Sequence, residues 1–149
     1  MEFTDYDTRL AAYAVIIDAS SGEDHLLLAL WNEADLPRWT LPGGGVELEE
    51  SAEQGAVREV CEETGYDVRL GRLLGVHTYV VPPERRLSGV PRHLKPVRVV
   101  FEADIIGGEL RNELDGTTDE ARWFPLSEVP DLSRVGLVDI AVDLWRSAR

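Results

Sequence analysis

The sequence predicts an α/β fold in which helices cover both faces of a mixed β-sheet, as an α/β/α sandwich. One strongly signalled helix, Ala52–Glu63, is preceded and followed by segments rich in β-forming residues. A second segment, Val135–Ala148, carries apolar residues at helical spacing. Strands flanked by two patterned helices are typical of layered domains. At 149 residues and 44% hydrophobic content, the chain can bury one core, so we expect a single domain over residues 1–149.

The strands are predicted from runs of β-forming residues bounded by turn residues. A polar turn joins the first two, and a polar loop, Asn32–Arg38, then leads to Trp39 and the glycine segment Pro42–Gly45. Gly71 and Gly75 interrupt the long β-forming segment that follows the helix. The predicted strand segments are Ala11–Asp18, His25–Trp31, Val68–Val81, Val97–Ile106 and Ala121–Pro125.

Residues 51–65 carry start and stop signals for a helix. Ser51 followed by Gln54 is a capping-box pattern, and Thr64-Gly65 is a helix stop. At about 100° per residue, the carboxylates of Glu59, Glu62 and Glu63 fall on one face. The adjoining apolar face suits packing on a sheet and comprises Ala56, Val57, Val60 and Cys61.

The three carboxylates predict a bound divalent cation. Like charges at these spacings repel by roughly 0.2–0.5 kcal/mol per pair on an exposed helix. Mg²⁺ relieves that repulsion, because it prefers oxygen ligands and is often shared with substrate phosphates. The glycines of Pro42–Gly45 let the main chain approach a metal or phosphate closely. Arg58 is suited to hold Glu50 by a bidentate hydrogen bond that fixes the loop between them. The alternative is a solvated acidic helix face, the usual role of a charge run.

The segment from Gly44 to Tyr66 resembles the Nudix box, G-x5-E-x7-R-E-U-x-E-E-x-G-U, where U is a bulky apolar residue. All seven fixed positions are filled, by Gly44, Glu50, Arg58, Glu59, Glu62, Glu63 and Gly65. Tyr66 stands at the last U position, which is usually aliphatic. The resemblance implies the Nudix-type sandwich with a mixed sheet. It also implies metal ligation by Glu59, Glu62, Glu63 and the Gly43 carbonyl, with Arg58 and Glu50 as the orienting pair. Glu62, Glu63, Arg58 and Glu50 are therefore expected to be catalytic.

The formal net charge of −13 at pH 7 restricts the partners of the chain. It argues against binding to nucleic acid, and it would repel a phosphorylated substrate unless a cation or a local basic patch intervenes. Cys61 is the single cysteine, which excludes an intramolecular disulfide and is compatible with the cytoplasm. The first residues, MEFTDYDTRL, lack a secretory pattern, and no run approaches the roughly 20 apolar residues of a membrane span. We expect a cytoplasmic protein with no nucleic-acid or membrane partner.

The segment Pro82–Pro96 is the most basic stretch of this acidic chain. Its arginines, with one more just beyond it, are candidate substrate-binding residues because guanidinium groups match the geometry of phosphate. The candidates are Arg85, Arg86, Arg92 and Arg98. The alternative is a solvated connection that proline holds extended.

A second acidic loop, Glu109–Glu120, carries further carboxylates. Many Nudix enzymes place an additional carboxylate there, as a metal ligand or as the base that deprotonates water. The candidates are Glu113, Asp115, Asp119 and Glu120. Glu120, just before Ala121-Arg122-Trp123, is the first choice for a catalytic role and Asp119 the second. The alternative is a polar turn with exposed carboxylates.

The resemblance predicts a Mg²⁺-dependent hydrolase, with Mn²⁺ as a substitute ion, that cleaves a diphosphate bond by metal-activated water. Its substrate would be a nucleoside diphosphate linked to another group, either a nucleoside triphosphate or an ADP-ribose-like nucleotide sugar. Pro82 stands where ADP-ribose hydrolases of the family often carry proline, but the surrounding Ser-Pro-Gly pattern is absent. The alternative function is a Nudix-fold sensor that binds a nucleotide sugar without turnover. Dimers are common in the family, so a homodimer is compatible with the resemblance.

Overall fold

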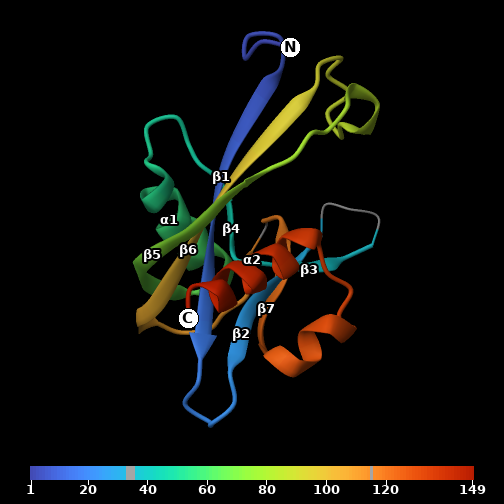
Figure 1. Cartoon of the computed structure of the whole chain (residues 1–149). Coiled ribbons are helices and arrows are strands. Elements are labelled where there is room, and N and C mark those ends of the chain that lie inside the picture. The colour runs from blue at the N-terminus through green and yellow to red at the C-terminus, as the bar shows by residue number, and fades with distance from the viewer. Residues whose placement is uncertain (33–35, 115) are drawn as a thin grey trace.

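The computed structural model describes residues 1–32, 36–114 and 116–149. These residues form a seven-stranded sheet with helices on both sides (Figure 1). Neither α-helix in this part of the chain is long and apolar enough to cross a membrane. In chain order the elements are β1 (Asp7–Asp18), β2 (His25–Trp31), β3 (Arg38–Thr40), β4 (Gly43–Gly45), α1 (Ala52–Thr64), β5 (Tyr66–Thr78), η1 (Pro83–Arg85), β6 (Leu94–Gly108), β7 (Thr118–Pro125), η2 (Leu126–Asp131) and α2 (Gly136–Ser147).

Strand β1 is at the centre of the sheet. The strand order is β3-β2-β1-β6-β5, with β4 paired to β1 and β7 paired to β2. β1 runs parallel to β6 and antiparallel to β2 and β4, so the sheet is mixed, as predicted. Figure 1 shows that β1, β5 and β6 extend well past α2 towards the N-terminal end of the molecule. One end of the sheet face that carries α2 is therefore not covered by that helix.

Alternate side chains of β1 enter cores on opposite faces of the sheet, as strand geometry requires. Ala14 and Ile16 pack in a cluster with Val60 of α1. Val15, between them, packs in a cluster with α2. The α2 members of that cluster are Leu137, Val138, Ala141, Val142 and Trp145. The two helices thus cover opposite faces, which confirms the predicted α/β/α sandwich.

Helix α1 begins where the capping signal predicts. The Ser51 hydroxyl accepts the amide of Gln54 at 3.1 Å, and the Gln54 side chain accepts the amide of Ser51 at 2.9 Å. At the other end Gly65 adopts a left-handed φ of 83° and donates to the carbonyl of Cys61. The helix includes Thr64, one residue beyond the predicted end. These caps fix the rotation at which α1 presents its carboxylates.

Several strands are longer than predicted, because pairing extends them past the β-forming runs. β5 and β6 pair over most of their length with register shifts, so Gly71 and Gly75 lie within β5. The first residues of β6 pair with the start of β1, which the sequence pattern does not reveal. Gly75 also lets α2 approach, since a Cβ there would lie 3.0 Å from the Leu144 side chain.

Candidate active site

The glycine segment β4 brings the main chain against the carboxylate face of α1. Gly43 pairs with Tyr13 and Gly44 with Ala12 of β1. Gly43 has a φ of 145°, and a Cβ there would lie 2.6 Å from the Tyr13 Cα. A Cβ on Gly44 would lie 2.9 Å from the carboxyl carbon of Glu59. Gly43 therefore requires glycine for the strand to lie between β1 and α1, whereas a side chain at Gly44 would displace the Glu59 carboxylate.

Glu63 is a buried carboxylate, with 3% of its surface exposed. One of its oxygens accepts the amide of Gly43 at 3.0 Å. Burial raises the pKa of Glu63 well above its ordinary value, and the negative charges of Glu59, Glu113 and Glu62 raise it further. Burial likewise raises the pKa of Glu59. No Lys or Arg among the described residues forms an ion pair with Glu63.

Arg58 holds the loop before α1 and two of the box carboxylates. Its Nε and Nη2 donate to the two oxygens of Glu50 at 2.7 and 2.9 Å, which is the bidentate bond expected from the sequence. Nη2 also donates to the carbonyl of Gly45 at 3.0 Å. These hydrogen bonds lower the pKa of Glu50 to about 2. Nη1 donates to Glu59 at 3.1 Å and to Glu62 at 3.3 Å.

The donor set fits a hard divalent cation. Glu63 is buried, Glu59 is partly buried, and Glu62 is half exposed on the same face of α1. Carboxylate oxygens are the ligands that Mg²⁺ prefers. The carboxylates are not gathered round one point, and no group of three or more Asp, Glu, His or Cys in the described ranges is arranged to hold an ion. Arg58 accounts for part of this arrangement, because it draws Glu59 and Glu62 towards itself.

A cleft of about 1280 Å³ opens beside these carboxylates. Glu59, Glu63 and the glycines of β4 form one wall. The N-terminal residues of α2, Val135–Leu137, form another, and the loop residues 85–88 close a further side. The cleft thus connects the Glu63 carboxylate with the uncovered end of the sheet.

The chain matches a known family over most of its length. The family model of the NUDIX domain matches residues 7–140. The chain belongs to the Nudix family. An ADP-ribose pyrophosphatase of Methanocaldococcus jannaschii is 37% identical over 122 residues, which make up 80% of this chain and 66% of that protein. A putative 8-oxo-dGTP diphosphatase of Bacillus subtilis is 34% identical over 129 residues, 83% of this chain and 74% of the relative.

Solved Nudix structures have the same fold. A NUDIX hydrolase from Nitrosomonas europaea superposes with a TM-score of 0.76 at 21% identity, covering 95% of this chain and 90% of the other. Likeness at this identity shows the shared fold, so the roles of individual side chains rest on the geometry of this chain.

The four arginines proposed for substrate binding have different surroundings. Arg86 and Arg92 both bind the carboxylate of Asp7, at 2.8 and 2.9 Å, and Arg92 also donates to the carbonyl of Thr4. They hold the loop after β5 to the start of β1, although Arg86 still lines the cleft. Arg85 and Arg98 also line the cleft, and no carboxylate among the described residues lies within ion-pair distance of either.

In the second acidic loop, Glu113 is the candidate carboxylate whose charge acts on the carboxylates of the Nudix box. Its charge raises the pKa values of both Glu59 and Glu63, and it accepts the Thr118 hydroxyl at 2.7 Å. Gly116 permits this position, since a Cβ on Gly116 would overlap the Glu113 carboxylate. Asp119 accepts a hydrogen bond from Asn32. Asp115 lies outside the described residues.

The first choice in this loop, Glu120, is not brought to the box carboxylates. It accepts the Nε of Arg122 at 2.8 Å. Alternation along β7 places Glu120, Arg122 and Phe124 on one face. Phe124 packs with α2, whereas Trp123 packs in the cluster that contains Val60 of α1. Glu120 therefore faces away from α1.

Two residues of the cleft, Arg9 and Tyr13, carried no signal in the sequence. Both belong to β1, four residues apart and therefore on the same face of the strand, and both line the cleft. Burial raises the pKa of Tyr13, while the charges of Arg9 and Arg98 oppose this effect. Only the pairing of β1 with β4 and β6 shows that these side chains lie near the Nudix box.

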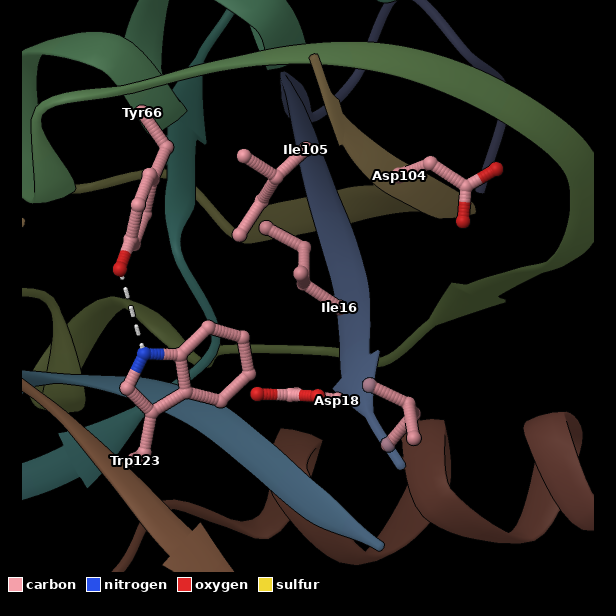
Figure 2. A pocket seen from close by; sticks show the side chains of 7 residues that line it. Ile16, Asp18, Tyr66, Asp104, Ile105 and Trp123 are labelled. Carbon is pink, nitrogen blue, oxygen red and sulfur yellow. Dashed lines mark hydrogen bonds between the residues drawn. The ribbon is translucent and has the colours of Figure 1, made fainter. Parts of the chain in front are cut away.

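A smaller pocket of about 300 Å³ lies at the opposite end of β1 (Figure 2). Figure 2 shows Ile16 and Ile105 between the Tyr66 ring and the Asp104 carboxylate, with the Asp18 carboxylate beside the Trp123 ring. The Trp123 indole donates to the Tyr66 hydroxyl at 3.4 Å. None of the Nudix-box carboxylates lines this pocket, so the larger cleft is the candidate active site.

Proposed function

We propose that this chain is a Mg²⁺-dependent hydrolase that cleaves the diphosphate of a nucleoside diphosphate linked to another group. The observation that carries the proposal is the burial of Glu63 beside the Gly43 amide, with Glu59 in the same cleft and no cationic side chain to balance Glu63 among the described residues. Relatives named ADP-ribose pyrophosphatase and 8-oxo-dGTP diphosphatase support the substrate class. A reduced single cysteine and a nucleotide substrate are consistent with the cytoplasm.

The carboxylates of Glu59, Glu62 and Glu63, with the main chain at Gly43, would hold the ion. When bound, Mg²⁺ would neutralise charge on the diphosphate and lower the pKa of a bound water, so that this water can attack phosphorus at neutral pH. Mn²⁺ would substitute for Mg²⁺. Arg58 keeps Glu59 and Glu62 in place. Through Glu50 it also fixes the loop between the glycines of β4 and helix α1. Any loosening of this pair would move the carboxylates relative to the substrate.

Glu113 is the residue that we assign as general base. Its charge acts on both Glu59 and Glu63, and its carboxylate accepts a hydrogen bond from Thr118, a residue that lines the cleft. In the proposed step, a water oxygen attacks one phosphorus, the bridging P–O bond breaks, and the water proton passes to Glu113. The products are a nucleoside monophosphate and the phosphorylated second group, or pyrophosphate where that group is phosphate.

A nucleotide panel, measured with and without Mg²⁺, tests this function. Wild-type protein should release a mononucleotide only with Mg²⁺, and Glu63→Gln should lower turnover by orders of magnitude with the fold intact. Glu53→Gln, at an exposed position in the first turn of the same helix, is the matched control and should keep wild-type turnover. Tight nucleotide binding without release from any member of the panel would contradict the enzyme and favour a sensor.

A further inference from the structure

The end of the cleft away from the Nudix-box carboxylates is lined by cationic side chains. Arg98 of β6 is paired with Ala11 of β1, and strand alternation puts it on the same face as Arg9 and Tyr13, which flank Ala11. All three side chains line the cleft. The N-terminal end of α2 lines another side of the same cleft.

The guanidinium of Arg98 is held in a fixed orientation. It lies over the Tyr79 ring, 4.5 Å from the ring centroid, and its Nη2 is 3.0 Å from the Nδ1 of His77. The His77 ring in turn stacks on Tyr79, with centroids 6.0 Å apart. Burial and the charge of Arg98 lower the pKa of His77, which favours the neutral ring as the hydrogen-bond acceptor. Aromatic and imidazole contacts orient the cation without cancelling its charge.

Arg98 keeps its charge uncompensated in a very acidic chain. Neither Arg98 nor Arg9 forms an ion pair with a carboxylate of the described residues, and the buried Nε of Arg98 has no hydrogen-bond partner there. The chain has a formal net charge of −13, so carboxylates are abundant. Holding arginines in a cleft without carboxylate partners is characteristic of a site for an anion.

Tyr13 lies between the two ends of the cleft, with Arg9 and Arg98 on one side and Glu63 on the other. Gly43, which donates to Glu63, lies against Tyr13, since a Cβ on Gly43 would be 2.7 Å from its ring. The charges of Arg9, Arg98 and Glu63 all act on the Tyr13 hydroxyl. Arg98 and Arg9 are therefore accessible, within the same cleft, to a group next to a diphosphate bound at Glu63.

We propose that Arg98, oriented by Tyr79 and His77 and assisted by Arg9, is a specificity-determining residue that binds an anionic group beyond the diphosphate being cleaved. The chain accordingly prefers nucleoside triphosphates, which end in a phosphate, over nucleoside diphosphate sugars, which end in an uncharged sugar. This inference rests on the proposed function and adds the substrate class within it.

Matched substrate pairs test the preference: ATP against ADP-ribose, and GTP against GDP-mannose. Arg98→Met should lower kcat/KM for the triphosphates by about 10- to 100-fold, the usual effect of one charge-assisted hydrogen bond, and leave the sugars nearly unchanged. Arg98→Lys should recover part of the loss. Arg146→Met, at an exposed position on α2, makes the same change in net charge and should leave both classes unchanged. An equal loss for both members of a pair, or wild-type preference for the sugars, would overturn the inference.

Calorimetric titration with tripolyphosphate separates this inference from the proposed function. If no nucleotide is hydrolysed, the proposed function fails, yet the anion site is still measured by binding. Tripolyphosphate should bind wild type and Arg146→Met alike and bind Arg98→Met about 10-fold or more weakly. Equal binding to all three proteins would refute the role of Arg98. Equal melting temperatures of the variants would show that the fold is intact.

Discussion

The amide of Gly43 donates to the carboxylate of Glu63 at 3.0 Å, joining the residue just before the Nudix box to a glutamate 20 residues further along the chain. This bond requires β4 to lie directly against α1, and only glycine allows that approach. The same contact brings Tyr13 of β1 next to the site, because Gly43 and Tyr13 are paired. The position of Glu63 is therefore set by the sheet as much as by its own helix.

Gly43→Ala should destabilise the fold and abolish activity. The φ of 145° is unfavourable for alanine, and its Cβ would collide with Tyr13. Strain of this kind costs about 1–3 kcal/mol, and the collision adds to it. Urea unfolding of wild type and variant measures the loss in free energy of unfolding. Gly136→Ala is the control, since a Cβ there meets nothing within 4 Å, and it should be neutral or slightly stabilising. Equal stability of the two variants would contradict the close approach.

Arg58→Lys should lower kcat while the protein stays folded. Lysine cannot make the bidentate bond to Glu50, so the loop and the carboxylates of Glu59 and Glu62 lose their common support. We expect about a 10- to 100-fold decrease, typical of residues that orient metal ligands. Steady-state kinetics measures it. Arg72→Lys removes contacts to Glu102 and the Ala148 carbonyl on the other side of the sheet, and its kcat should match wild type.

Glu113→Gln should reduce turnover far more than Glu120→Gln. The charge of Glu113 acts on Glu59 and Glu63, whereas Glu120 is bound to Arg122, on the face of β7 that carries Phe124. Loss of a general base typically costs about 10²–10⁴-fold. Single-turnover rates at saturating Mg²⁺ and substrate compare the two variants. A large loss with Glu120→Gln and none with Glu113→Gln would reverse the assignment.

These cases show which parts of the site were predictable from the sequence. Arg58 and Glu50 are eight residues apart in one local segment, and their opposite charges together with the resemblance to the Nudix box were enough to predict their bond. Arg86 and Arg92 meet Asp7 across 79 and 85 residues, and no local pattern reveals that partner. Their role in holding the loop to β1 was therefore not predictable, and their role in substrate binding stays a prediction.

The orientation of Glu120 was not predictable from the sequence for a related reason. Whether a residue of β7 faces α1 or α2 depends on the alternation of the strand and on its pairing with β2, which shifts register between Ala29 and Trp31. Position in the loop sequence does not determine that face. Arg9 and Tyr13 were missed because their role depends on the pairing of β1 with β4 and β6.

Asp7→Asn should remove an acid-dependent part of the stability. Hydrogen bonds from Arg86, and then from Arg92, lower the pKa of Asp7 below its ordinary 3.8. A carboxylate with a lowered pKa stabilises the fold fully above its unfolded pKa, and this stabilisation is lost as the pH falls through the lower folded value. The stability difference between wild type and variant should thus be constant from pH 7 to about pH 5 and shrink below pH 4. Urea midpoints across this range measure it, and a difference that grows on acidification would contradict the ion pairs.

Removal of divalent metal should reverse the order of stability of wild type and Glu63→Gln. Without metal, the buried Glu63 has no cationic partner among the described residues, so burying its charge opposes folding and the neutral variant should melt at or above the wild-type temperature. With Mg²⁺ at about 100 times its dissociation constant, binding stabilises the wild type by about 2.7 kcal/mol, which corresponds to a rise of several degrees. The variant should gain much less, because one ligand is lost.

Scanning calorimetry of both proteins in EDTA and in Mg²⁺ gives the four melting temperatures. Glu53→Gln should follow wild type in both buffers, and an equal Mg²⁺ effect on wild type and Glu63→Gln would exclude Glu63 as a ligand.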